Sequence, residues 1–208
     1  MKQFPLIILI ACLSSSAFSQ IQNEDSGIVK TMQRLADTTI ILQYPSVWSR
    51  DPKIQFLSKK GDTINIYDYK QPKYTLKINS TLPKAMARAI YGNHYNEFWR
   101  ESVSINRFFR VVDKSPDSLR LIWKQVIKLR PWKINDDAID GEGCPLVKGK
   151  GVMTIDDAGG IYILLVTKTS IKPLNFYALH DYEKFCPGRK GRQAAIKLTS
   201  MFYNVFKE

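Results

Sequence analysis

The sequence has few of the residues that build metal centres and thiol or imidazole catalysts. Its 208 residues include three cysteines and two histidines, and two histidines are too few for a typical zinc site. No HExxH, GK[ST] or G-x-S-x-G segment is present, so the patterns of zinc proteases, P-loop proteins and α/β-hydrolases are missing. These absences favour a non-catalytic role and predict neither a cofactor nor a metal centre.

The chain also lacks a hydrophobic run long enough to cross a bilayer. Its most apolar stretch, Phe4 to Leu13, is far shorter than the roughly 20 residues of a transmembrane helix. Lys2 precedes this stretch and small residues follow it, which is the layout of a secretory signal. We therefore expect a signal peptide over 1–19 and a single domain over 20–208. That domain would be exported, periplasmic or secreted, with no transmembrane segment after signal removal.

A second interpretation of the N-terminus stays open. Residues 9–12, Leu-Ile-Ala-Cys, resemble the short box that precedes the lipid-modified cysteine of bacterial lipoproteins. Acylation at Cys12 would hold the protein at a membrane surface. The sequence alone does not choose between cleavage before Gln20 and cleavage at Cys12.

Acidic residues are scarce relative to basic ones. The chain has 31 Lys and Arg against 19 Asp and Glu, a formal net charge of +12. Export and the missing interleaving of aromatic with basic residues argue against nucleic acid. An anionic glycan, a lipid head group or a protein partner of the envelope or extracellular space is the expected ligand.

The first half of the chain predicts a helix followed by strands. Ser26 is a favourable helix N-cap, and Thr38 to Tyr44 is β-branched and apolar, which favours a strand. Residues 54–58 and 63–69 are expected to pair as a hairpin, because Gly61 between them supports the positive φ of a tight turn. Further elements are expected over 74–78 (strand), 81–90 (helix) and 105–112 (strand).

Residues 115–129 are compatible with a helix or a strand. Ser115 as N-cap, Pro116 in the first turn and Asp117 near the positive end of the dipole favour the helix. The strand remains an alternative, since the tryptophan, valine and isoleucines of this segment tolerate either conformation.

The second half predicts more strands and a final helix. The apolar run over 161–166 suggests a central strand buried on both faces. A strand over 152–155 would precede it, a strand over 174–179 would follow Pro173, and a helix is expected over 192–206. Because the strands come as hairpins, the expected class is α+β, a mainly antiparallel sheet with three to four helices and one disulfide.

Two cysteines remain once the signal is removed. An even count in an oxidising compartment indicates a bridge between Cys144 and Cys186. It would close a loop of about 43 residues and stabilise the fold by roughly 4 kcal/mol on a chain-entropy model. The alternative is a cysteine nucleophile with His180 as its base, which needs a free thiolate.

Two charged segments are candidate binding sites. The first is an acidic loop whose glycines and carboxylates would suit a hard cation, although EF-hand spacing is absent; an aromatic residue precedes it. Its candidates are Trp132, Asp136, Asp137, Asp140 and Glu142. The second is a basic turn before the last predicted helix, where Arg189, Lys190 and Arg192 are candidates for binding a phosphate, sulfate or carboxylate.

Three fragments together resemble small, uncharacterised exported bacterial proteins that share a paired Cys-Pro pattern. They are FLSKKGDT (56–63), WKINDD (132–137) leading to DGEGCP (140–145), and FCPG (185–188). The resemblance implies a structural pairing of Cys144 with Cys186. It implies no activity and transfers no functional residue.

The leading hypothesis is a non-catalytic exported domain that binds an envelope or extracellular ligand. One alternative is a hydrolase of envelope or glycan polymers, which needs paired carboxylates roughly 5–10 Å apart; Glu97 and Asp140 are the candidates. Another is a lipoprotein subunit of an envelope assembly, anchored through Cys12.

Overall fold

The computed structural model describes residues 27–44, 53–69, 109–140, 155–156 and 158–207. In these ranges six strands form one sheet in the order β4-β3-β2-β1-β5-β6, and every neighbouring pair is antiparallel. The fold class is therefore α+β, as predicted. The strands are β1 (Thr38–Tyr44), β2 (Lys53–Lys60), β3 (Thr63–Tyr69), β4 (Phe109–Val111), β5 (Gly160–Thr167) and β6 (Ile171–Tyr177).

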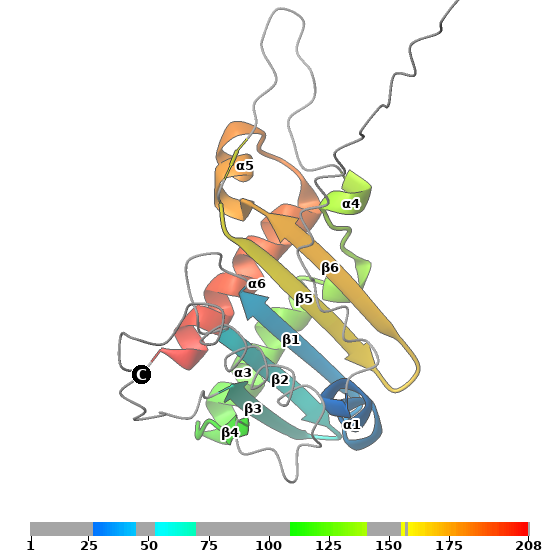
Figure 1. Cartoon of the computed structure of the whole chain (residues 1–208). Coiled ribbons are helices and arrows are strands. Elements are labelled where there is room, and N and C mark those ends of the chain that lie inside the picture. The colour runs from blue at the N-terminus through cyan, green and yellow to red at the C-terminus, as the bar shows by residue number, and fades with distance from the viewer. Residues whose placement is uncertain (1–26, 45–52, 70–108, 141–154, 157, 208) are drawn as a thin grey trace, which may run out of the picture.

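Helices cover both faces of this sheet (Figure 1). One face packs against α3 and α6, and the other packs against α1. The α-helices of the described ranges are α1 (Gly27–Leu35), α3 (Pro116–Lys128), α4 (Asp137–Asp140), α5 (Leu179–Phe185) and α6 (Lys190–Phe206), joined by a 3₁₀ turn, η2 (Pro131–Lys133).

The inner strand β5 shows why two cores form. Ile161, Ile163 and Leu165 pack toward α3 and α6, whereas Tyr162, Leu164 and Val166 pack toward α1. Side chains of a strand alternate between the faces of its sheet, so a strand buried on both sides needs an unbroken apolar run. The predicted burial on both faces is confirmed, while the strand lies between β1 and β6, next to the edge of the sheet, rather than at its centre.

The hairpin of β2 and β3 follows the predicted turn chemistry. Gly61 adopts φ 55°, in the left-handed region that glycine enters without steric cost. Its backbone N–H donates to Asp37 Oδ2 at 2.7 Å, and Lys168 Nζ lies 2.7 Å from Asp37 Oδ1. This carboxylate therefore joins the start of β1 to the turns after β2 and β5.

Residues 116–128 are a helix, which decides between the two structures that the sequence allowed. The Ser115 hydroxyl accepts a hydrogen bond from Ser118 N at 3.3 Å, and Pro116 begins the helix. Leu119 and Val126 are the buried residues of its apolar side. The N-cap and the proline explain why this apolar segment begins as a helix.

Two details of the second half differ from the sequence-based expectation. Strand β6 begins at Ile171 and includes Pro173, which a strand tolerates here because β6 is the last strand of the sheet. The short helices α4 and α5 were not expected. Helix α5 follows Ala178 in a left-handed conformation without a side-chain cap, so no local signal marks its start.

Several predicted features lie outside the described residues. They are Ser26, the elements over 74–78 and 81–90, and residues 152–154 of the predicted strand over 152–155. The predicted strand over 105–112 is represented by β4. Among the described helices, none has the length and apolar character needed to cross a bilayer.

Candidate functional site

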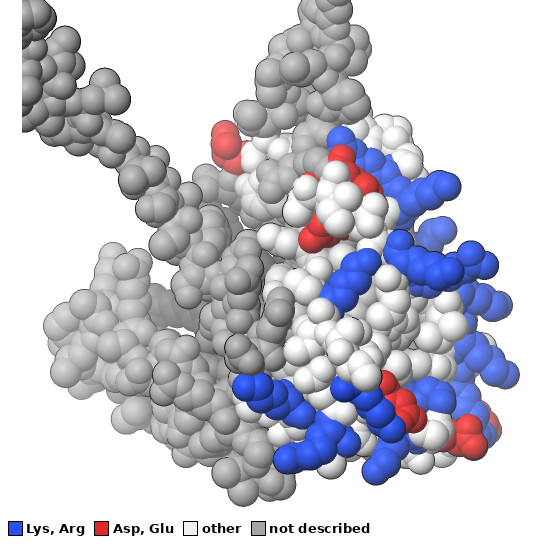
Figure 2. All heavy atoms as spheres, turned by 90° about the vertical axis from the view of Figure 1, so that its right-hand side faces the viewer, with Lys and Arg blue, Asp and Glu red and all other residues white. Residues whose placement is uncertain are grey.

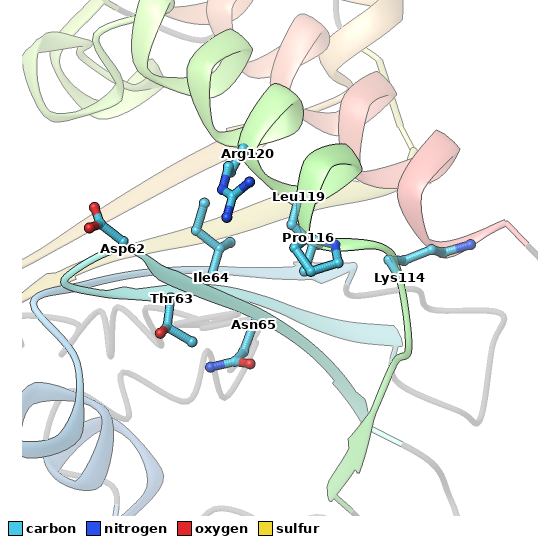
Figure 3. Close-up of a pocket in the computed structure, with 8 residues that line it drawn as sticks. All are labelled: Asp62, Thr63, Ile64, Asn65, Lys114, Pro116, Leu119 and Arg120. Atoms are coloured by element: carbon cyan, nitrogen blue, oxygen red, sulfur yellow. The ribbon is translucent and has the colours of Figure 1, made fainter.

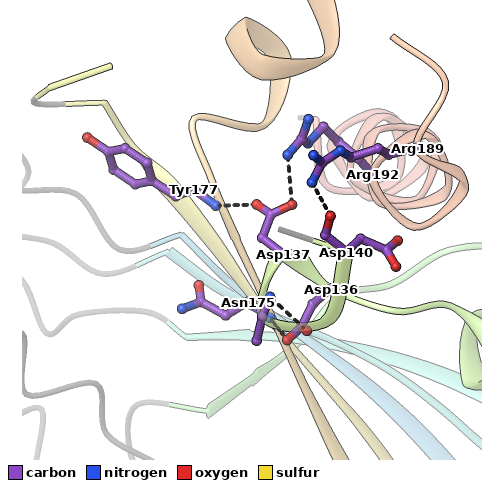
Figure 4. Close-up of polar contacts among 8 residues, drawn as sticks. Asp136, Asp137, Asp140, Asn175, Tyr177, Arg189 and Arg192 are labelled. Atoms are coloured by element: carbon purple, nitrogen blue, oxygen red, sulfur yellow. Dashed lines mark hydrogen bonds and ion pairs between the residues drawn. The ribbon is translucent and has the colours of Figure 1, made fainter. Parts of the chain in front are cut away.

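The carboxylates of Asp136 and Asp137 point into the protein at the end of β6 (Figure 4). Asp136 Oδ2 accepts a hydrogen bond from Asn175 N at 2.9 Å, and Asp137 Oδ2 accepts one from Tyr177 N at 3.1 Å. Asp136 Oδ1 also accepts from Ala138 N at 3.2 Å, which starts α4. These two aspartates are 9% and 5% exposed and hold α4 against the strand.

These contacts close an edge of the sheet. Strand β6 is an end strand, and alternate N–H groups of such a strand point away from its neighbour. Of the alternate positions 173, 175 and 177, the first is a proline without an N–H, and the other two donate to Asp136 and Asp137. The two adjacent aspartates therefore accept the hydrogen bonds that a further strand would otherwise accept from β6.

Asp137 also forms a buried ion pair with α6. Its Oδ1 lies 2.8 Å from Arg192 Nη2, and the two side chains are 4% and 0% exposed. The Arg192 guanidinium lies 5.3 Å from the centroid of the Tyr182 ring. Loss of one partner from a buried pair is costly because it leaves an uncompensated charge. Arg192, a candidate for anion binding, is thus directed inward and joins α6 to α4.

The turn between α3 and α4 is held from two sides. Lys172 Nζ of β6 donates to the carbonyls of Trp132 and Ile134 at 3.2 and 2.7 Å. At the start of α6, a Cβ added to Gly191 would lie 1.9 Å from the carbonyl oxygen of Asn135. Glycine permits this close approach of helix and turn, which brings the WKINDD segment against the residues that follow the CPG segment.

A groove of about 430 Å³ opens where this turn meets α6, and we call it the α3–α6 groove. Arg130, Lys133 and Lys190 lie along it and are exposed. Arg130 has φ 50°, a left-handed conformation that is uncommon outside glycine and that turns the chain from α3 into η2. The remaining lining residues are Leu129, Ile134, Asn135, Asp140, Gly191 and Ala194.

The three cations of the groove are not used in ion pairs of the described structure. Asp140 contributes the one carboxylate of the lining. Its Oδ1 accepts from Asn135 Nδ2 at 3.3 Å, and its backbone carbonyl accepts from Arg189. Arg189, another predicted anion-binding residue, thus supports the α4 end beside the groove.

A second hollow, of about 310 Å³, lies between β3 and the start of α3 (Figure 3). Arg120 and Lys114 line it together with Asp62. Arg120 Nη1 also lies 2.7 Å from Asp117 Oδ1. Carboxylates therefore balance the cations here, whereas the α3–α6 groove keeps an excess of positive charge.

Exposed cations continue from the groove along the helices. We call the following set the basic side: Arg120, Lys124 and Lys128 of α3, Arg130 and Lys133 after it, and Lys190 and Lys197 of α6. Helices α3 and α6 pack on the same sheet face. Figure 2 shows, on an adjoining face of the molecule, many Lys and Arg side chains and few Asp and Glu side chains.

The other predicted site residues are placed as follows. Trp132 is half-buried in η2, and its indole nitrogen is buried without a hydrogen-bond partner among the described residues. Cys186 is buried where α5 ends. Cys12, Glu97, Glu142 and Cys144 lie outside the described residues. No group of three His, Cys, Asp or Glu side chains in the described ranges is arranged to hold a metal ion.

Sequence reasoning had not selected Arg130 and Lys133. The signal available was their position on either side of Trp132, in a turn that separates two helices. Their proximity to Lys190 depends on the packing of α6 against that turn, which no local pattern reveals. No known family model matches this sequence, and the search of curated proteins found no match.

Proposed function

We propose that this protein is a non-catalytic exported domain that binds an anionic ligand of the envelope or the extracellular space. The observation that carries the proposal is the groove on the basic side, whose three cations form no ion pair with the residues that the structure describes. Ligand sites are typically concave and combine apolar walls with a few polar groups. The groove has this composition, with Leu129, Ile134 and Ala194 beside its cations.

The acidic side chains near the groove are buried and hydrogen-bonded while the basic ones are exposed, and this difference supports the same proposal. The buried aspartates near the groove are occupied by backbone N–H groups and Arg192, whereas Lys124, Lys128 and Lys197 are exposed. A surface that presents one sign of charge attracts ligands of the opposite sign over distances up to about 10 Å at moderate salt. The basic side therefore favours an anionic partner.

A bridge between Cys144 and Cys186 is part of the proposal. Cys186 is buried where α5 ends, and Cys144 is the one other cysteine that remains after removal of the predicted signal. Cys186 lies four residues before the start of α6. A bridge there would hold the segment after α4 close to the groove and would rule out Cys186 as a free nucleophile.

The test is binding of the mature chain to heparin and to anionic vesicles of phosphatidylglycerol and phosphatidylcholine. The variant Lys124→Glu with Lys128→Glu should bind both probes at least about tenfold more weakly. The matched control, Arg34→Glu with Lys60→Glu, makes the same charge change at exposed positions of α1 and β2 and should bind as the wild type does. Equal losses in both variants, or no binding by the wild type, would overturn the proposal.

A further inference from the structure

We propose that the α3–α6 groove is a specific site for a phosphate monoester carried on an apolar group. This inference rests on the proposed function and gives it a ligand class. The basic side attracts anions in general, whereas the groove combines charge, volume and apolar surface in one place. Each of these three properties restricts the ligand further.

The charge of the groove matches a dianion. Arg130, Lys133 and Lys190 contribute three positive charges, and Asp140 contributes one negative charge, which leaves an excess of two. A phosphate monoester carries roughly −1.5 to −2 at pH 7, while a carboxylate or a phosphodiester carries one negative charge. Arginine can bind phosphate through two parallel N–H groups, and lysine binds it as a compact point charge.

The volume of the groove leaves room for more than the phosphate. Its 430 Å³ falls within the roughly 300–1,000 Å³ of small-molecule sites. The apolar lining consists of Leu129, Ile134 and Ala194, from the end of α3, the following turn and α6. Burial of apolar ligand surface there is worth about 25 cal/mol per Å², so the organic part of the ligand is expected to be apolar.

The walls of the groove are positioned before any ligand arrives. Lys172 fixes the turn through two carbonyls, and Gly191 brings α6 against Asn135. The Asp137–Arg192 pair then joins α4 to α6 beneath them. Preorganised sites lose less conformational entropy on binding, which favours recognition of a small ligand over a loose electrostatic contact.

Calorimetric titration of the mature chain with phenyl phosphate and with inorganic phosphate tests the inference. Phenyl phosphate should bind, and inorganic phosphate should bind at least about tenfold more weakly, because it lacks the apolar part. Lys133→Ala with Lys190→Ala should weaken phenyl phosphate binding by about tenfold or more. The matched control, Lys60→Ala with Lys207→Ala, removes two exposed lysines that neither line the groove nor belong to the basic side, and should change it by less than about twofold.

A steric variant tests the apolar part separately. Ala194→Leu places a larger side chain on the groove wall, so it should weaken phenyl phosphate binding and leave inorganic phosphate binding unchanged. The inference is overturned if the wild type does not bind phenyl phosphate, if the two lysine pairs have equal effects, or if Ala194→Leu leaves phenyl phosphate binding unchanged. Heparin binding that still depends on Lys124 and Lys128 would then show that the proposed function stands without this site.

Vesicles distinguish the two sources of such a phosphate. Phosphatidylcholine vesicles with and without phosphatidic acid present the monoester on a lipid. If binding requires phosphatidic acid and is lost in Lys133→Ala with Lys190→Ala, the ligand is a lipid phosphate. If phenyl phosphate binds to the groove and these vesicles do not, the ligand is a soluble organic phosphate.

Discussion

The acidic pair Asp136–Asp137 and two cations of the α3–α6 groove, Arg130 and Lys133, are close in the sequence, but the aspartates are paired inside the protein and the cations are exposed. The aspartates are buried, and their oxygens accept from strand β6 and from Arg192. Arg130 and Lys133, a few residues earlier, are exposed along a groove. Buried charges require partners, whereas exposed cations remain available to a ligand. The acidic motif therefore supports the fold, and the basic residues beside it are the better candidates for function.

Removal of the Asp137 carboxylate should have the largest effect on stability. Asp137→Ala leaves Arg192 charged and buried, and the free energy of unfolding should fall by about 3–5 kcal/mol. Urea denaturation followed by circular dichroism measures the change. The matched comparison is Lys133→Ala, which removes an exposed cation of the α3–α6 groove and should change stability by less than about 0.5 kcal/mol.

A double variant sharpens this result. Asp137→Leu with Arg192→Met replaces both charges by apolar groups, so it should recover part of the lost stability, as replacement of a whole buried pair often does. If Asp137→Ala lowers the free energy of unfolding no more than Lys133→Ala does, the contrast between the buried aspartates and the exposed cations of the groove is wrong.

Asp136→Ala should have an intermediate effect. It leaves the N–H groups of Asn175 and Ala138 without their carboxylate acceptor, at a cost of about 1–3 kcal/mol for an unsatisfied buried group. It also opens part of the β6 edge, so self-association should increase with concentration in size-exclusion chromatography. Asp140→Ala removes an exposed carboxylate at the end of α4 and should leave both measurements close to the wild type.

The smallest effect is expected at Asp37, whose side chain is 42% exposed, and it depends on pH. The hydrogen bond from Lys168 and, to a smaller extent, that from the Gly61 N–H lower the pKa of Asp37 below its ordinary value of 3.8. Because the folded pKa is the lower one, the stabilising contribution is complete above the unfolded value and is lost as the pH falls through the folded value. Asp37→Asn should therefore lower Tm slightly near neutral pH.

The difference in Tm between the wild type and Asp37→Asn should shrink as the pH falls to about 2. Thermal unfolding at a series of pH values measures it. Lys168→Gln removes the main cause of the lowered pKa and should reproduce most of the loss. A difference in Tm that grows toward acid pH would contradict the assignment.

Local patterns predicted much of the fold. The apolar run of β5, the Ser115 cap with Pro116, and Gly61 in its hairpin each act within a few residues, and the structure has these elements at those places. Pro173 was expected to precede a strand and lies inside β6 instead. The reason is that only the position of a strand within the sheet decides whether it can accept a proline.

The candidate site was predicted less completely. Trp132, Arg189 and Lys190 lie on, or next to, segments that border the groove, while Arg192 and Asp137 face each other inside the protein. A charged residue has the same sequence signature whether its partner is another side chain or a ligand. Predictions about the signal peptide, lipidation at Cys12 and export concern residues outside the described ranges and stay predictions.

The sequence by itself determined the periodicities, caps and turns of this protein, because these depend on interactions between residues near one another in the chain. It also determined the excess of positive charge. The tertiary structure alone decided which charged side chains are paired inside the protein and which remain exposed to a ligand. That choice depends on the packing of α6 against the turn after α3 and of α4 against β6, contacts between segments roughly 40 to 55 residues apart.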